Sequence, residues 1–253
     1  MITSLQNPKL KWVRTLLSKK NQRTLDHAFV CEGIRLAEEA LQCQQAPLLA
    51  LYSSSLSERG MRLLEQCACE TLEVEVTLMD KVSATETSQG LLLVLPFIEN
   101  PLPANPDFLL LLDKIKDPGN FGTILRAALA FGVQGILYTS GSVDPYSPKV
   151  VRSGMGAHFR IPLQKVDGEY LSSLSRCVQL LLADVENGSP CWEADLQKPL
   201  CLIIGNEAHG ASDTVRQLPH QNLHIPMPGN MESLNAAMAA NILLYETVRQ
   251  RKS

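Results

Sequence analysis

Apolar and polar positions change their pattern about 100 residues into the chain. From residue 108 onward, short apolar runs alternate with segments of helical spacing. This alternation predicts strands at 108–112, 135–139, 159–162, 179–183, 200–204 and 224–227, and helices at 122–131, 148–155, 169–177, 211–218 and 233–251. The order is typical of a mainly parallel sheet covered on both faces. Ligands bind such sheets beyond the carboxyl ends of strands, so a site is expected in the loops that follow residues 112, 204 and 227.

The first 98 residues are predicted to form a small mixed α/β domain. The pattern predicts helices at 8–18, 34–41 and 57–67 and strands at 48–52, 74–78 and 90–96. Residues 99–107 contain Pro101, Pro103 and Pro106, which forbid a regular helix and disfavour a central strand. We therefore predict a domain at 1–98, a linker at 99–107 and a second domain at 108–253.

Composition argues against a membrane-spanning, secreted or disulfide-rich protein. The 253 residues are 45% hydrophobic, yet no apolar run is long enough for a membrane span and the first 17 residues do not resemble a signal peptide. The 7 cysteines are odd in number and include no C-x-x-C pair, so neither a disulfide framework nor a metal site is indicated. A reducing cytoplasm is the expected location, with no membrane and no metal.

Charge is distributed unevenly, although the formal net charge is only -3. Residues 1–35 hold two acidic and seven basic side chains, the basic ones being Lys9, Lys11, Arg14, Lys19, Lys20, Arg23 and Arg35. Such a run is usually a solvated helix face, but it is also the electrostatic footprint of a nucleic-acid-binding surface. The run by itself leaves both interpretations open.

Residues 113–126 form the first expected site loop. An Asp-Pro-Gly-Asn turn leads into a helix, and Asn120 is predicted to be the N-cap. Arg126 follows among apolar neighbours. An arginine there is more often a surface or paired residue than a functional one.

Residues 203–210 and 225–240 form the other two loops. Gly205 and Gly210 flank Glu207, and glycines there allow backbone to approach a ligand or simply to turn from strand to helix. In the third loop Ser233 precedes an alanine-rich helix and is predicted to be its N-cap. Taken singly, each loop is explained by capping and packing.

Taken together, the three loops resemble the three signature motifs of the SpoU (TrmH) family of RNA methyltransferases, in the SPOUT superfamily. The matching residues are Asn120, Gly122 and Arg126 for N-x-G-x-x-x-R, Gly205, Glu207 and Gly210 for G-x-E-x-x-G, and Ile225, Pro226, Met227, Ser233, Leu234 and Asn235 for the third. Residues 153–162 are similar to another recurrent family segment, and parts of residues 1–98 resemble the L30e-like RNA substrate-binding domain of longer members. One departure is Ala236-Ala237, where many relatives carry Val and Ser.

The resemblance implies the fold, the cofactor and the assembly. The expected fold is α/β: a C-terminal parallel-sheet SPOUT methyltransferase catalytic domain with a deep trefoil knot, plus a small N-terminal α/β L30e-like domain. The implied cofactor is S-adenosyl-L-methionine, with contacts carried over to Gly205, Glu207, Ile225, Met227, Ser233 and Leu234. Relatives are homodimers that build each active site from both subunits, with the final helix in the interface.

The implied reaction is methyl transfer to a ribose 2′-hydroxyl, with ribosomal RNA as the substrate and transfer RNA as the alternative. The catalytic residues implied by the motifs are Arg126, Asn120, Glu207, Ser233 and Asn235. Because a guanidinium holds its proton firmly, Arg126 is expected to fix a phosphate and stabilise developing charge, while another acceptor or water takes the proton. The seven basic residues of 1–35 are then expected to bind RNA phosphates.

Two rival classes of function remain to be weighed. A catalytically silent RNA-binding or assembly factor of the same fold is disfavoured, because a binder has no need of the full set of motif residues. A dinucleotide-dependent oxidoreductase is disfavoured because no G-x-G-x-x-G opens a helix after an early strand.

Overall fold

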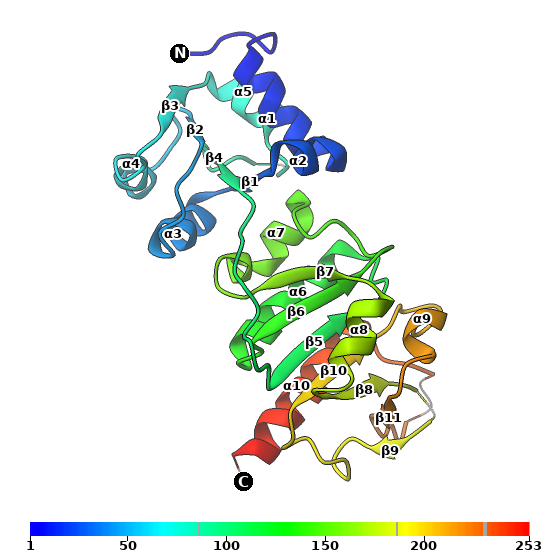
Figure 1. The fold of residues 1–253 in the computed structure, drawn as a ribbon. Coiled ribbons are helices and arrows are strands. Elements are labelled where there is room, and N and C mark those ends of the chain that lie inside the picture. Colours follow the sequence, from blue (N-terminus) through cyan, green and yellow to red (C-terminus); the bar gives the residue numbers. More distant parts are fainter. Residues whose placement is uncertain (86, 186, 230–231, 253) are drawn as a thin grey trace. The chain divides into compact units, whose positions relative to one another are not determined.

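The computed structural model describes residues 1–85, 87–185, 187–229 and 232–252 (Figure 1). Two compact units are present, one comprising Met1–Ile98 and Asp144–Phe159 and the other Glu99–Val143 and Arg160–Ser253. The first unit therefore contains a segment from the middle of the chain in addition to residues 1–98. Residues 230 and 231 of the third loop lie outside the described part.

The first unit is built on a four-stranded sheet in the order β1-β4-β2-β3. Its strands are β1 (Ala28–Glu32), β2 (Leu49–Tyr52), β3 (Glu70–Glu73) and β4 (Leu91–Pro96). The central strand β4 runs antiparallel to β1 and β2, whereas β2 and β3 are parallel. All five residues Leu91 to Leu95 of β4 are buried, so both faces of this sheet must be covered.

Helices cover the two faces of this sheet. They are α1 (Pro8–Ser18), α2 (Lys20–Asp26), α3 (Ile34–Gln42), α4 (Glu58–Leu64), α5 (Val76–Val82) and α7 (Pro148–Gly154), followed by a 3-10 turn at Ala157–Phe159. Side chains of α1 and α5 share one apolar cluster with even-numbered residues of β4. Odd-numbered residues of β4 belong to a second cluster, which includes α3, α4 and Val151 of α7. The period-2 alternation of a strand thus divides β4 between two cores.

Four elements of this unit differ from the prediction. The predicted strand 74–78 is wrong: Val74 makes only an isolated bridge to Ile2, and α5 occupies residues 76–82. Leu78, Met79 and Val82 are buried at helical spacing, so packing against α1 overrides a short apolar pattern that also suits a strand. Helix α2 and strands β1 and β3 were not predicted.

The second unit confirms the predicted α/β class. Its seven-stranded sheet has the order β7-β6-β5-β10-β8-β11-β9, and every neighbouring pair is parallel. The strands are β5 (Phe108–Leu112), β6 (Gly135–Thr139), β7 (Leu163–Val166), β8 (Gln179–Ala183), β9 (Ser189–Pro190), β10 (Leu200–Ile204) and β11 (Gln221–His224). The helices are α6 (Pro118–Ala130), α8 (Gly168–Leu174), α9 (Asp213–Arg216) and α10 (Ala236–Arg251), with α6 and α10 packed together. The central strands β5 and β10 are entirely buried.

Both predicted helix caps in this unit are wrong. Helix α6 begins at Pro118, and its N-cap is Asp117, whose side chain accepts a hydrogen bond from the backbone N–H of Asn120 at 2.7 Å. Proline suits the first helical position because it has no N–H to satisfy there, so the N-cap lies three residues earlier than predicted. Helix α10 is capped by Asn235, not by Ser233.

Two predicted strands are displaced along the chain. The strand expected at 159–162 lies at β7, since Pro162 can only accept a ladder hydrogen bond and does so from Ile136 N–H at 2.8 Å. The strand expected at 224–227 ends at His224, two residues before Pro226. No helix in the described part of the chain is long and apolar enough to cross a membrane.

Candidate active site

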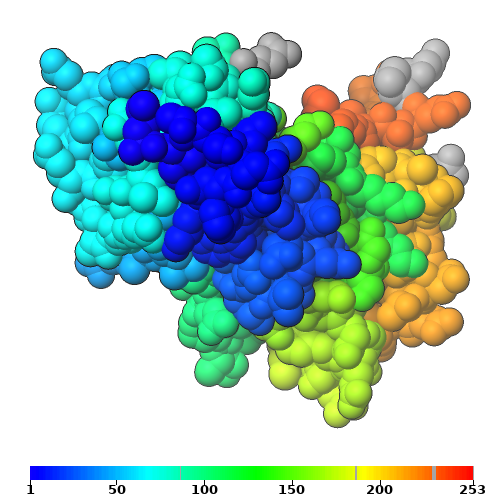
Figure 2. Space-filling view, turned by 90° about the horizontal axis from the view of Figure 1, so that it is seen from above, coloured from blue at the N-terminus to red at the C-terminus, as the bar shows by residue number. Residues whose placement is uncertain are grey.

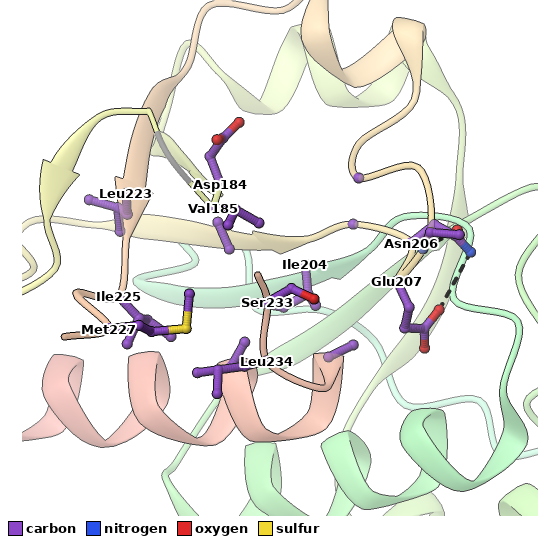
Figure 3. Close-up of a pocket in the computed structure, with 16 residues that line it drawn as sticks. Asp184, Val185, Ile204, Asn206, Glu207, Leu223, Ile225, Met227, Ser233 and Leu234 are labelled. Carbon is purple, nitrogen blue, oxygen red and sulfur yellow. Dashed lines mark hydrogen bonds between the residues drawn. The ribbon is translucent and has the colours of Figure 1, made fainter. Parts of the chain in front are cut away.

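A cavity of about 220 Å³ lies at the carboxyl ends of β8, β10 and β11 (Figure 3). Its lining residues are Ala183, Asp184, Val185, Ile204, Gly205, Asn206, Glu207, Ala208, Gly210, Leu223, Ile225, Met227, Ser233, Leu234, Ala236 and Ala239. They come from four separate segments between residues 183 and 239. This is the edge of a parallel sheet at which ligands are expected.

All six residues expected to contact the cofactor line this cavity. Gly205 and Glu207 come from the loop after β10, Ile225 and Met227 from the segment after β11, and Ser233 and Leu234 from the turn before α10. Figure 3 shows Ile225 and Met227 at one end of the cavity and Glu207 at the other, with Ser233 and Leu234 between the sheet and α10. The structure therefore brings the second and third motifs together around one space.

The cavity fits a cationic organic ligand. Most of its lining is apolar, and its charged side chains are the carboxylates of Asp184 and Glu207; no described lining residue is basic. A positive charge placed there would interact favourably with both carboxylates. S-adenosylmethionine carries a sulfonium and an ammonium, so the residues present suit this cofactor. Among the described residues, no group of His, Cys, Asp and Glu could hold a metal ion.

Gly205 lets the loop after β10 close on itself. A Cβ built on Gly205 would lie 2.5 Å from the carbonyl carbon of Gly210 and 2.6 Å from the nitrogen of Ala211. Both neighbours are backbone atoms, so a side chain could be accommodated only if the loop moved. Gly210 has φ +65°, a conformation that favours glycine.

A chain of side-chain hydrogen bonds joins the three motifs at one end of this cavity. Asn235 Nδ2 donates to Asn120 Oδ1 at 2.9 Å, and Asn120 Nδ2 donates to Glu207 Oε1 at 2.7 Å. Asn120 is free to make both bonds because Asp117, not Asn120, caps α6. Three residues of the expected catalytic set are therefore in direct contact.

Capping fixes the direction of every bond in this chain. Asn235 Oδ1 accepts from the backbone N–H groups of Ala237 at 2.9 Å and Met238 at 3.3 Å, so the amide group of Asn235 must face Asn120. Asn120 then presents its oxygen to Asn235 and its amide to Glu207. Glu207 is consequently held as a hydrogen-bond acceptor.

Asn206 is a site residue that the sequence analysis missed. Its Nδ2 donates to the carbonyl oxygen of Lys114 at 2.9 Å, and its Oδ1 accepts from the backbone of Ala208 at 3.0 Å and His209 at 3.2 Å. Its backbone also pairs reciprocally with Gly210. Asn206 therefore fixes the second loop and ties it to the first; an Asn after a strand-ending Gly is a turn signal that could have indicated this.

Arg126 does not line the cavity of its own chain. It lies on α6 with an exposed side chain, and it makes no hydrogen bond or ion pair with any described residue. Ser233 lines the cavity and is exposed. The structure thus brings together Asn120, Glu207 and Asn235, with Ser233 beside them on the cavity wall, and leaves Arg126 free on the surface.

The basic residues of 1–35 separate into two groups. Lys9 pairs with Glu70 at 2.9 Å, and Arg23 is buried and pairs with Asp144 at 2.5 Å. Arg23 is therefore not accessible to RNA. The others are exposed: Lys11, Arg14, Lys19, Lys20 and Arg35.

A parallel sheet whose loops form such a cavity is the architecture of α/β proteins that bind a small organic ligand. Residues 107–245 match the SpoU rRNA Methylase family, and residues 7–93 match the MRM3-like substrate binding domain. The chain therefore belongs to the SpoU rRNA methylase family.

Individual relatives agree with this membership. The 23S rRNA (guanosine(2553)-2′-O)-methyltransferase RlmP of Bacillus subtilis is 32% identical, over 96% of this chain and 97% of its own length. The 23S rRNA (uridine(2479)-2′-O)-methyltransferase of Streptomyces viridochromogenes is also 32% identical, over 100% of this chain and 93% of its own length. The crystal structure of the SpoU methyltransferase AviRb of that organism, in complex with AdoMet, matches with a TM-score of 0.88 at 30% identity, covering 97% of this chain and 99% of that chain.

Proposed function

We propose that the protein transfers a methyl group from S-adenosylmethionine to a ribose 2′-hydroxyl of ribosomal RNA. The observation that carries the proposal is the hydrogen-bonded chain Asn235–Asn120–Glu207, which joins all three motifs beside a cavity suited to a cationic ligand. When bound, the cofactor supplies a methyl group already activated on a sulfonium. The protein must therefore position the ribose oxygen and stabilise the charge that develops on it.

We assign cofactor binding to the cavity lining. Gly205, Ile225 and Leu234 supply backbone and apolar contacts, while Glu207 presents a carboxylate and Ser233 a hydroxyl. Asn120 and Asn235 hold Glu207 in a fixed orientation. A carboxylate held in a fixed orientation favours binding of a cationic ligand, because little conformational freedom is lost when the ligand binds.

Arg126 acts on the RNA rather than as a base. Its guanidinium keeps its proton, and its exposed, unpaired position on α6 leaves its donors free for a phosphate. The bond from methyl carbon to sulfur breaks as the bond to the ribose oxygen forms, and the hydroxyl proton leaves to another acceptor or to water. Because Arg126 does not line its own cavity, we place it at the cavity of a second copy.

A homodimer through α10 is supported by the surface of that helix. Met238, Ile242 and Tyr245 are 57%, 38% and 59% exposed, and they follow one another at helical spacing on one face. Exposed apolar residues in a row mark an interaction surface. Helix α6, which carries Arg126, packs against α10, so the same interface would bring Arg126 near the partner.

The substrate assignment rests on the first unit and on the relatives. The first unit matches a substrate-binding domain and exposes six of the seven expected basic residues, all but Arg23. The two relatives described above act on different nucleotides of 23S rRNA, a guanosine and a uridine, at equal identity to this chain. We therefore propose ribosomal RNA without naming the nucleotide, and we keep the trefoil knot and the cytoplasmic location as predictions.

Arg126→Ala tests the assignment. We expect methyl transfer to total ribosomal RNA from cells lacking the gene to fall roughly 100-fold or more, while cofactor affinity measured by calorimetry stays unchanged. Arg176→Ala, at an exposed arginine outside the three motifs, is the matched control. Full activity of Arg126→Ala would refute its role, and absence of cofactor binding by the unaltered protein would favour the silent RNA-binding factor instead.

A further inference from the structure

A groove in the first unit runs between α1 and α5. Its lining residues are Lys11, Arg14, Thr15, Leu17, Ser18, Lys81, Val82, Ser83 and Ala84. We propose that this groove binds the phosphate backbone of a single-stranded segment of the RNA substrate, with Lys81 as a phosphate contact that no sequence pattern indicated. The proposal rests on the proposed function in taking RNA as the substrate, and it adds the surface that binds it.

The geometry of α1 places one wall of the groove. Lys11, Arg14, Thr15 and Ser18 are spaced three and four residues apart, so they share one face of the helix. The other face is buried in one apolar cluster with α5; its members include Leu10, Val13, Leu16, Leu78, Met79 and Val82. The two walls are therefore held at a fixed separation. In Figure 2 the dark-blue N-terminal residues form part of the surface, next to the cyan region that contains α5.

The three cations of the groove are not neutralised by the protein. Lys11, Arg14 and Lys81 are exposed, and none forms an ion pair with an acidic residue in the described part of the chain. Lys9 and Arg23, in contrast, each pair with a carboxylate. Folding brings Lys81 to the same groove as Lys11 and Arg14, from which it is distant in sequence. The groove therefore concentrates unpaired positive charge.

Two acidic residues could in principle neutralise Lys81: Asp80, its neighbour in sequence, and Glu32, which contacts the residues that follow it. Asp80 precedes it but does not line the groove, as expected because successive helix residues do not share a face. The Glu32 carboxylate accepts hydrogen bonds from Ser83 Oγ, from Ala84 N–H at 2.8 Å and from Thr85 Oγ1. Glu32 is therefore engaged in fixing the end of the groove rather than in pairing with its lysines.

The hydroxyls of the groove are also engaged internally. Thr15 Oγ1 donates to the carbonyl oxygen of Lys11 at 2.7 Å, and Ser18 Oγ donates to that of Arg14 at 2.8 Å. The donors left for a ligand are those of the three cations, which suit phosphate oxygens and carry no base sequence. Helices packed in contact have axes about 8–10 Å apart, and this narrow spacing is our reason for assigning a single strand, not a duplex, to the groove.

The test is the salt dependence of RNA binding by the full chain. Affinity for a fluorescently labelled single-stranded RNA would be measured by anisotropy over a range of salt concentrations, for the unaltered protein, Lys81→Gln and the triple variant Lys11→Gln/Arg14→Gln/Lys81→Gln. Each lost phosphate contact should reduce the slope of log K against log salt by about 0.7, and the triple variant by about 2. A fourfold rise in salt should then cost the unaltered protein roughly 15-fold to 20-fold more affinity than the triple variant.

Matched controls separate the groove from general positive charge. Lys149→Gln and Arg62→Gln remove exposed charges from α7 and α4 of the same unit and should leave the slope unchanged. The proposal is overturned if Lys81→Gln leaves the slope unchanged, if the controls reduce it equally, or if the unaltered protein does not bind the RNA. Cofactor binding by calorimetry in the same samples reports separately on the proposed function.

Discussion

The side-chain amide of Asn235 donates to the side-chain oxygen of Asn120 at 2.9 Å, and this bond joins residues 115 positions apart in the sequence. It connects the N-terminus of α10 to the first turn of α6. Because Asn120 in turn donates to Glu207 at 2.7 Å, the orientation of a carboxylate on the cavity wall depends on how two helices begin.

Asn120→Asp should disable the site without unfolding the protein. The change replaces the amide donor with a carboxylate oxygen facing Glu207, so two negative charges would meet where a 2.7 Å hydrogen bond now stands. Displacement of Glu207 is expected to reduce methyl transfer roughly 100-fold. Asn21→Asp, the same substitution at an exposed position of α2, should leave activity unchanged in the same assay. Equal activity of the two variants would show that the chain of bonds is dispensable.

Gly205→Ala should weaken cofactor binding. The added methyl group would lie within 2.6 Å of two backbone atoms, and the loop carrying Glu207 would have to shift. We expect a loss of roughly tenfold or more in cofactor affinity by calorimetry, about 1.4 kcal/mol. Gly229→Ala is the control, because no described heavy atom lies within 4 Å of its added Cβ. An unchanged dissociation constant for Gly205→Ala would contradict the close-packed loop.

Asp113→Ala should destabilise the second unit. The buried carboxylate of Asp113 accepts from Thr139 Oγ1 and from the backbone N–H of Ser212, both at 2.6 Å. Both donors would lose a buried partner, which costs about 2–4 kcal/mol of unfolding free energy in urea. Asp80→Ala, at an exposed position, should cost much less. Thr139→Val combined with Asp113→Ala should be less than additive, and full additivity would exclude the pairing.

Stability should fall in mild acid because of His158. Burial lowers the pKa of His158 to about 4, against the smaller opposing effects of the hydrogen bond from Nε2 to Pro145 O at 2.8 Å and of the Asp144 carboxylate. Nδ1 has no hydrogen-bond partner among the described residues, so no acceptor would stabilise a second proton there. The unfolded chain binds a proton near pH 6.5 and the folded chain does not, so stability is complete above about pH 6.5 and decreases toward pH 4. Between about pH 6.5 and 5 the unfolding free energy should decrease by about 1.5 kcal/mol.

His158→Gln is the control for this pH dependence. Glutamine can still donate to Pro145 O but does not titrate, so the variant should lose the slope between pH 6.5 and 5. The carboxyls of Asp26, Asp195 and Glu246, whose pKa values are lowered by their hydrogen-bond partners, contribute only in more acidic solution. A variant with the same slope as the unaltered protein would assign the effect to other groups.

Ile242→Glu should dissociate the proposed homodimer. The side chain lies between Met238 and Tyr245 on the exposed apolar face of α10, and a carboxylate at the centre of an apolar interface would be buried without a partner. Sedimentation velocity should shift from dimer to monomer at a concentration at which the unaltered protein is dimeric. Leu25→Glu, which places the same charge on another exposed leucine, should not change the assembly. A monomeric unaltered protein would refute the interface.

Four central strands were predicted with the bounds that the structure has. They are β5, β6, β8 and β10, each a run of five mostly apolar residues. Such runs suit only the buried middle of a parallel sheet, so local pattern and tertiary environment agree. Where a short apolar pattern suited both a strand and a helix, as at Leu78, packing against α1 decided the outcome.

The sequence predicted which motif residues belong to the candidate site, but not which of them contact one another. The motifs gave the residue types, and the parallel order gave the edge of the sheet at which they meet. Asn120 was predicted as a catalytic residue but its hydrogen-bond partners were not, and Asn206 was not predicted at all, because each residue is positioned by a partner in another loop, Glu207 and Lys114 respectively. The local sequence allows an asparagine side chain to cap a helix, to bind across a loop or to face solvent. Only the groups that surround it in the folded protein decide between these outcomes.

The amino-acid sequence alone determined the α/β class, the order in which the site loops follow one another along the chain, and the family. Apolar periodicity and motif spacing are properties of the chain itself, so they can be recognised before it folds. Tertiary structure decided which polar groups are engaged. In the folded protein Arg23 is paired with Asp144, Arg126 is exposed and unpaired, and Lys81 lines the same groove as Arg14. Charge pairing and hydrogen bonding act over a few ångströms in space, and residues distant in sequence reach that range only once the chain has folded.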